Sequence, residues 1–97
     1  MKLYQIEVKA SARKQIQALP KQMQDRVGKA IDELALDPRP RGCKKVSGAG
    51  SDRYRIRVGR FRVIYRVFDD RLVVLIVKVA HRKEAYRNLA GGASWLN

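Results

Sequence analysis

Alternation of apolar and polar residues is strictest in the middle of the chain, from Arg53 to Val67. Such a period of two is typical of a β-strand, because a strand points successive side chains to opposite faces. Gly59-Arg60 interrupts the alternation where a two-residue hairpin turn of the Gly-X kind fits. The sequence therefore predicts an antiparallel hairpin with one face in the core. The core face would carry Tyr54, Ile56, Val58, Phe61, Val63 and Tyr65, and the outer face Arg53, Arg55, Arg57, Arg62, Ile64 and Arg66.

The N-terminal third predicts a strand and two helices. Alternation over Lys2 to Lys9 predicts a half-buried first strand. A short helix is expected from Ala12, with Ser11 as its N-cap, until Pro20 interrupts it. Pro20 suits the first turn of a second helix, where apolar residues recur at i, i+3 and i+4 spacing. Asp37-Pro38 would end that helix, since a residue before proline disfavours the helical region.

The C-terminal third begins with a near-continuous apolar run, LVVLIVKV. Such a run is typical of a central strand covered on both faces. A short last helix is expected from His81 to Gly91-Gly92, followed by a flexible tail over residues 91–97. The prediction is one α+β domain spanning residues 1–97, in the order β-α-α-β-β-β-α. Its small, mainly antiparallel sheet of four strands would carry the helical hairpin on one face and leave the arginine face open.

Charge changes the picture of the outer face. The chain has 97 residues, with 22 basic and 9 acidic side chains and a net charge of +13. Between Arg39 and Arg66, ten lysines and arginines accompany one acidic residue, Asp52. A solvated strand face usually mixes both signs of charge, whereas arginine presents a planar fork that fits phosphate. We therefore interpret the outer face as a phosphate-binding surface and expect nucleic acid as the partner, with Lys44 and Lys45 adding to the attraction.

The sequence shows no signal for secretion, a membrane span, a disulfide or a metal site. The N-terminus is too short and polar for a signal peptide, and no apolar run reaches the length of a membrane span, so we expect a cytoplasmic protein. Cys43 has no second cysteine for a disulfide, and Cys43 and His81 alone do not make a metal site. No metal or other cofactor is expected.

The order and spacing of several segments resemble the RelE group of the RelE/ParE toxin superfamily. These segments are the helical hairpin, DPRPRG, KKVSG, RYRIRVGRFRVIYRV, the apolar strand and HRKEAYR, together spanning Tyr4 to about Leu89. The resemblance implies a prokaryotic toxin that cuts mRNA in the ribosomal A site without a metal. It also implies contacts with mRNA and ribosomal RNA on the 70S ribosome, and a RelB-like antitoxin that holds the toxin inactive. Contact with DNA would occur only through that antitoxin.

The resemblance also assigns residues. The catalytic side chains would fall on Arg62, Arg82 and Tyr86, and Arg55 and Arg57 would bind RNA together with the neighbouring Arg53, Lys44 and Lys45. The best-known RelE enzymes have lysines where Arg55 and Arg57 stand. Because a guanidinium stays protonated, these two arginines can bind and stabilise charge but cannot accept a proton.

Alternatives remain at three levels. Tyr86 either has a functional role, in proton transfer or in stacking on a base, or only packs against the core; the functional role is favoured. His81 is the weaker catalytic candidate, as a general base, against a structural role at the end of a strand. Tyr54 and Tyr65 are expected in the core. For the whole protein, the alternatives are a ParE-type inhibitor of DNA gyrase and an RNA-binding module without catalysis.

Overall fold

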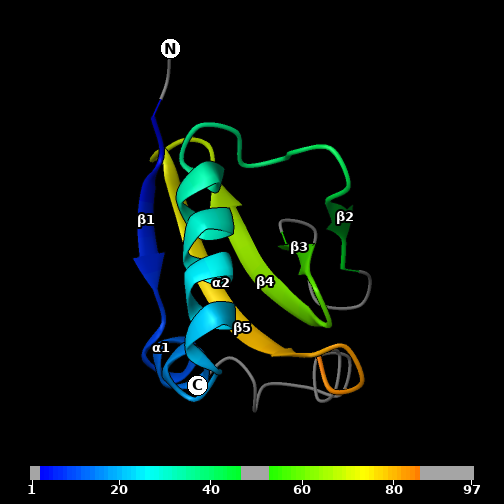
Figure 1. The fold of residues 1–97 in the computed structure, drawn as a ribbon. Coiled ribbons are helices and arrows are strands. Elements are labelled where there is room, and N and C mark those ends of the chain that lie inside the picture. Colours follow the sequence, from blue (N-terminus) through cyan, green and yellow to red (C-terminus); the bar gives the residue numbers. More distant parts are fainter. Residues whose placement is uncertain (1–2, 47–52, 86–97) are drawn as a thin grey trace.

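The computed structural model describes residues 3–46 and 53–85, which form one mixed sheet with two helices on one of its faces (Figure 1). The strands lie in the order β1-β5-β4-β3-β2; β1 is parallel to β5, and the other neighbours are antiparallel. In chain order the elements are β1 (Gln5–Val8), α1 (Ala10–Gln17), α2 (Lys21–Leu34), β2 (Lys44–Lys45), β3 (Arg53–Val58), β4 (Phe61–Phe68) and β5 (Val73–His81).

This architecture confirms the predicted α+β class and the order of the elements as far as β5. The sheet has five strands where four were predicted, because Lys44 and Lys45 in the basic loop pair with Arg55 and Tyr54 and form β2. The predicted last helix does not begin at His81, because His81 ends β5 and residues 82–85 form a turn. The rest of that predicted helix and the tail over residues 91–97 lie outside the described residues. No helix in the described part of the chain is both long and apolar enough to cross a membrane.

The predicted hairpin between β3 and β4 is confirmed. Val58 pairs with Phe61, so Gly59 and Arg60 alone form the turn. Gly59 has a φ of +59°, a conformation that costs glycine little and other residues more. A Cβ atom there would also lie 3.3 Å from side-chain atoms of Arg26 and Met23 in α2. The turn therefore needs glycine mainly for its backbone conformation, since the ends of the Arg26 and Met23 side chains can shift by the small amount required.

The start of α1 differs from the prediction. The helix begins at Ala10 and its N-cap is Lys9, so the assignment of Ser11 as N-cap is wrong. The reason is tertiary: the Lys9 N–H donates to the Ile76 carbonyl of β5, and the Lys9 carbonyl already accepts the N–H of Arg13. The chain thus turns directly from β1 into the helix, before a side-chain cap can form.

The core lies between the two helices and the sheet. α2 contributes Val27, Ile31 and Leu34, and the inner sheet face contributes the buried residues Ile56, Val58, Val63, Tyr65, Val67, Val74, Ile76 and Val79. Tyr65 is fully buried, and Tyr54 packs against the same cluster. The predicted core placement of both tyrosines is confirmed.

β5 is central, as predicted, but it contains an irregularity that its apolar sequence conceals. Tyr65 pairs with Ile76 while Ile64 pairs with Lys78, so Val77 is an extra residue in β5, as in a β-bulge. The bulge shifts the alternation by one position, so Val79 continues the helix-facing row of Val74 and Ile76. Lys78 and Ala80 consequently lie on the other face of the sheet.

That other face is partly covered, which corrects the prediction of an open arginine face. Val46, Ile64 and Ala85 form a second buried cluster, with Ala80 packed against it. Ile64 and Ala85 have no exposed surface. The turn that follows β5 therefore lies against this side of the sheet, and the outward-pointing Ile64 is covered by it.

Candidate nucleic-acid interface

Basic residues on the outer face of the sheet lie directly opposite one another on neighbouring strands. Arg53 pairs with Arg66, Arg57 with Arg62, and Lys44 with Arg55, so the predicted sharing of one face is confirmed. β2, β3 and β4 contain no acidic residue. Like charges directly opposite each other destabilise a sheet. A bound anion would relieve this repulsion, so the arrangement favours an anionic ligand over bulk solvent.

Exposure divides these residues into two groups. Arg57, Lys44 and Lys45 are exposed and Arg62 is half-buried. Arg53 and Arg55 are only 7% and 6% exposed, so the expectation that they line an open surface is wrong. Alternation identifies the face to which a side chain points, but it does not show what covers that face.

Arg62 lies beside the hairpin turn. Its Nη1 donates hydrogen bonds to the carbonyls of Phe61, at 3.0 Å, and Gly59, at 3.3 Å. These two bonds restrict the guanidinium to the start of β4. Among the described residues, the hydrogen bonds of this guanidinium are made by Nη1.

Arg82 approaches the same corner from another element. Its backbone N–H donates to the Arg60 carbonyl at 2.8 Å, which attaches the segment after β5 to the hairpin turn. Arg62 and Arg82, far apart in sequence, are thereby brought to one end of the sheet, and the Arg82 side chain is exposed. The third predicted catalytic residue, Tyr86, lies outside the described residues.

His81 belongs to a different surface. It pairs with Phe61 and so shares the helix-facing side, while Arg62 and Ala80 pair on the opposite side. Its ring contacts Phe61 edge to face at 5.7 Å, and its Nδ1 accepts the Lys83 N–H at 3.2 Å. A pocket of about 400 Å³ lies here, lined in part by Gln15 and Glu84. The geometry separates His81 from the arginine rows.

A second pocket, of about 310 Å³, lies on the β2 side of β3. Its lining consists of Arg41, Gly42, Lys44, Arg55, Ile56 and Arg57. Four of these six residues are basic and none is acidic. Arg41, in the DPRPRG segment between α2 and β2, is not among the predicted site residues, although the density of basic residues in that segment is a signal for it.

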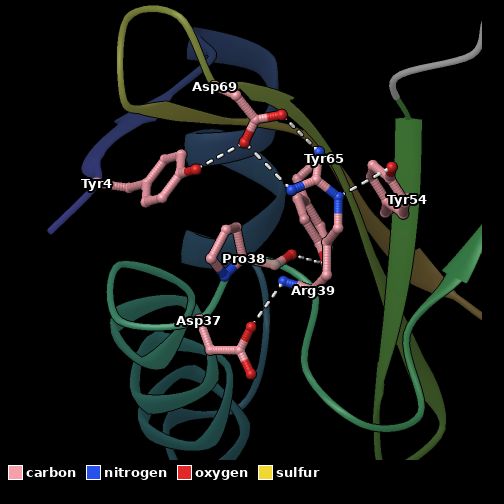
Figure 2. Close-up of polar contacts among 7 residues, drawn as sticks. All are labelled: Tyr4, Asp37, Pro38, Arg39, Tyr54, Tyr65 and Asp69. Atoms are coloured by element: carbon pink, nitrogen blue, oxygen red, sulfur yellow. Dashed lines mark hydrogen bonds and ion pairs between the residues drawn. The ribbon is translucent and has the colours of Figure 1, made fainter. Parts of the chain in front are cut away.

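The loop after α2 is held by a polar network at the opposite end of β4 from the hairpin turn (Figure 2). Arg39 forms a bidentate ion pair with Asp69, with Nη2–Oδ2 at 2.8 Å and Nη1–Oδ1 at 3.2 Å. Its Nε also donates to the Tyr54 hydroxyl at 3.0 Å. We call Arg39, Asp69 and their tyrosine partners Tyr4 and Tyr54 the Arg39 clamp. The hydrogen bond to Asp69 raises the pKa of Arg39, which stays charged in any case.

Tyrosine hydroxyls complete this end of the molecule. Tyr4 donates to Asp69 Oδ1 at 2.6 Å, and this bond raises the pKa of Tyr4. Tyr65 donates to the Pro38 carbonyl at 2.7 Å, and burial, followed by the nearby Cys43, raises the pKa of Tyr65. The rings of Tyr54 and Tyr65 stack with centroids 6.0 Å apart. Together these contacts fix the chain that leads into the basic loop.

The described residues contain no group of three or more His, Cys, Asp or Glu side chains that could hold a metal ion.

Comparison with known proteins agrees with this architecture. A sequence profile of the ParE toxin of type II toxin-antitoxin systems matches residues 6–86. The RelE1 protein of Methanocaldococcus jannaschii is 30% identical over 88 residues, which cover 88% of this chain and 97% of that protein. In the archaeal RelE–RelB complex from Pyrococcus horikoshii, one chain is 34% identical with a TM-score of 0.75, over 86% of this chain and 99% of that one. In the RelBE2 toxin-antitoxin complex from Mycobacterium tuberculosis, one chain is 27% identical with a TM-score of 0.72, over 82% of this chain and 99% of that one.

The profile covers most of the chain, so the protein belongs to the RelE/ParE superfamily, the toxins of type II toxin-antitoxin systems. Within that superfamily it is a RelE-type toxin, since its relatives in sequence and in structure bear RelE names.

Proposed function

We propose that this toxin is a ribosome-dependent endoribonuclease that cleaves mRNA in the A site and thereby inhibits translation. The observation that carries the proposal is the set of directly opposed cations on β2, β3 and β4, which favours a polyanion as ligand. The position of Arg62 and Arg82 at one corner of that face supports a site where two guanidinium groups act on one phosphate.

The proposed reaction needs no metal. The ribose 2′-oxygen attacks the adjacent phosphorus and loses its proton to a base, a bond between O2′ and phosphorus forms, and the bond from phosphorus to O5′ breaks. The departing O5′ takes up a proton, so the products are a 2′,3′-cyclic phosphate and a 5′-hydroxyl. Extra negative charge on the pentacoordinate phosphorus is the quantity that the protein has to stabilise.

Each candidate residue has a role that suits its chemistry. Arg62 and Arg82 stabilise the transition-state charge, since they approach from β4 and from the segment after β5. The exposed Arg57, Lys44 and Lys45 hold the mRNA backbone, because a guanidinium cannot act as a base. The buried Arg53 and Arg55 add positive charge to this face. The hydroxyl of Tyr86 orients the 2′-OH or transfers its proton. In-line geometry comes largely from mRNA bound to the ribosome.

The decisive experiment is primer extension on cellular mRNA after induction of the toxin, followed by single-turnover cleavage on purified programmed ribosomes. Cuts at a fixed position within codons are expected, with a 2′,3′-cyclic phosphate at the upstream end. Intact mRNA under growth arrest would contradict the proposal.

We further propose a RelB-like antitoxin as the partner. Two of the similar solved structures are complexes of RelE with RelB and of the RelBE2 pair. The net charge of +13 also favours association with an acidic chain. The product of the adjacent reading frame should co-purify with this protein and relieve growth arrest, and failure of both would contradict this assignment.

The matched family profile bears the name of the ParE toxin, which favours a second candidate function, inhibition of DNA gyrase. The two functions differ in a simple measurement. Blocked supercoiling by purified gyrase, with mRNA left intact in cells, would identify the ParE activity.

A further inference from the structure

The strand that leads to Arg82 extends further than the strand beside it. β1 ends at Val8, which pairs with Ile76, and the chain then leaves the sheet for α1. β5 continues to His81, and no described strand pairs with this last part on the side of β1. Val79 lies in this part and is only 2% exposed. A buried backbone N–H at such a place needs an acceptor that does not come from a strand.

A side chain of α1 supplies that acceptor. The Oε1 of Gln15 accepts the Val79 N–H at 2.8 Å, from 64 positions away in the sequence. Gln15 is half-buried and lies three residues after Ala12 and directly before Ile16, both of which pack in the core. An amphipathic helix usually has an apolar residue at this spacing. The contact with Val79 gives a physical reason for a glutamine there.

The hydrogen bond to Gln15 is linked to the direction of the next backbone groups in β5. Successive N–H groups of a strand point to opposite edges. When the Val79 N–H points to α1, the N–H groups of Ala80 and Arg82 alternate, and that of Arg82 points to β4. There it donates to the Arg60 carbonyl at 2.8 Å. A slip of one residue would turn this N–H away from β4 and would move the Arg82 side chain to the other face of the sheet.

The position of the bulge before this segment is weakly specified by side chains. The pairing with β1 ends at Ile76 and the extra residue Val77 follows directly, so β1 does not hold the part of β5 after the bulge. Val73 to Val77 are all apolar, so an extra residue elsewhere in this run would bury similar side chains. Lys78 opposes loss of the bulge, because it would then enter the helix side of the sheet. The bond to Gln15 is a second determinant of the register, and it comes from outside the sheet.

We propose that Gln15 is a positioning residue for the corner formed by Arg62 and Arg82. Its hydrogen bond to Val79 holds β5 in register after the bulge, and this register places Arg82 at the corner. Gln15 acts through the backbone of β5 and contacts no substrate. The effect on cleavage rests on the proposed function, whereas the effect on the register does not, so the two are tested separately.

The first test needs neither RNA nor ribosomes. Gln15→Leu removes the acceptor and keeps a side chain of similar size, whereas Gln15→Glu retains an acceptor oxygen. Amide hydrogen exchange, followed by NMR on the full chain, should become roughly tenfold faster at Val79 and Arg82 in Gln15→Leu, as expected for loss of one hydrogen bond. Exchange at Val74, before the bulge, should stay unchanged. Gln15→Glu should restore the exchange rates of the wild type.

The matched control is Gln17→Leu, the same substitution at an exposed glutamine of the same helix. It should leave exchange at Val79 and Arg82 unchanged. If Gln15→Leu accelerates exchange equally along the whole chain, Gln15 only adds to global stability and the proposal is wrong. Unchanged exchange at Arg82 in Gln15→Leu would also overturn the proposal, because the register would then be held without Gln15.

The second test asks whether the register affects cleavage on programmed ribosomes. Gln15→Leu should lower the single-turnover rate at saturating ribosomes by roughly 10–10², since misplacement of a catalytic group by about 1 Å costs up to 10². The ribosome concentration that gives half the maximal rate should change little, because the exposed Lys44, Lys45 and Arg57 lie on β2 and β3. Gln15→Glu should recover most of the rate. Failure of this rescue, in a folded protein with wild-type exchange at Arg82, would contradict the proposal.

A double variant separates an effect through Arg82 from a general loss. In a protein that already carries Arg82→Ala, Gln15→Leu should lower the rate little further, because both substitutions remove the same contribution. An equally large further loss would show that Gln15 acts by another route and would overturn the proposal. Absence of cleavage by the wild-type protein would contradict the proposed nuclease instead, and the exchange rates at Arg82 would still decide whether Gln15 holds the register.

Discussion

The two ends of the β3–β4 hairpin use arginine in opposite ways. At one end Arg39 is paired with both oxygens of Asp69 and bonded to Tyr54. Along the outer face, toward the turn, Arg57 stands opposite Arg62 with no acidic residue on either strand. The first arrangement is internally neutral and complete, whereas the second is complete only when an anion is added. The ion pair at Arg39 therefore contributes to the fold, whereas Arg57 and Arg62 have the charge to attract an anion.

The largest effect should come from the corner formed by Arg62 and Arg82. Arg62→Ala and Arg82→Ala should each lower the single-turnover cleavage rate on programmed ribosomes by about 10²–10³, the cost of removing one donor to a transition-state oxyanion. The melting temperature should change little, since neither side chain contributes an ion pair among the described residues. Full activity of both variants in a folded protein would contradict a catalytic role for this end of the hairpin.

The paired end should show the opposite result. Asp69→Asn keeps the shape of the side chain but removes the charge that Arg39 contacts. Because Arg39 and Asp69 are 40% and 56% exposed, the pair is worth only about 1 kcal/mol, so Tm should fall by about 4–8 °C. High salt should reduce the difference, since exposed ion pairs are screened. A variant with unchanged Tm but a large loss of cleavage would contradict the structural role of the clamp.

Alkaline pH should weaken the same end. The pKa of Tyr65 is raised in the folded protein, mainly by burial, relative to about 10 in the unfolded chain. A raised pKa means that the folded state keeps a proton that the unfolded state releases, so the contribution of Tyr65 is complete below about pH 10 and is lost as pH rises further. The free energy of unfolding in urea should fall by up to about 1.4 kcal/mol per pH unit above that value. Tyr65→Phe should flatten this dependence; an unchanged slope would show that another group is responsible.

The smallest effect is expected at His81. Its ring faces Phe61 on the helix side, away from the arginine rows, and its Nδ1 already accepts a hydrogen bond. His81→Ala should therefore change the cleavage rate less than Arg82→Ala or Tyr86→Phe, for which a large loss is expected. Abolished cleavage in a folded His81→Ala protein, with Arg82→Ala still active, would reverse the proposed roles.

The hairpin could be predicted from the sequence because strict alternation and one glycine determine it locally. The bulge at Val77 could not be predicted, because every residue from Val73 to Val77 is apolar. A shift of the alternation by one position therefore does not change the apolar pattern. The Arg39–Asp69 pair joins positions 30 residues apart, and no local rule connects them. Arg55 illustrates a further limit: its face was predictable, but its burial was not, because what covers that face is decided by tertiary folding.

The parallel pairing of β1 with β5 affects the order in which the protein is made. Gln5 pairs with Val73, so β1 can complete its pairing only after β5, the last of the described strands, has been synthesised. Pairings between such distant positions form slowly, because a long loop must close first. Until β5 has emerged, β1 and the core face of α2 lack their central neighbour, and the segment carrying Arg82 has not been placed beside the hairpin turn. The corner formed by Arg62 and Arg82 is thus assembled only after β5 has been synthesised.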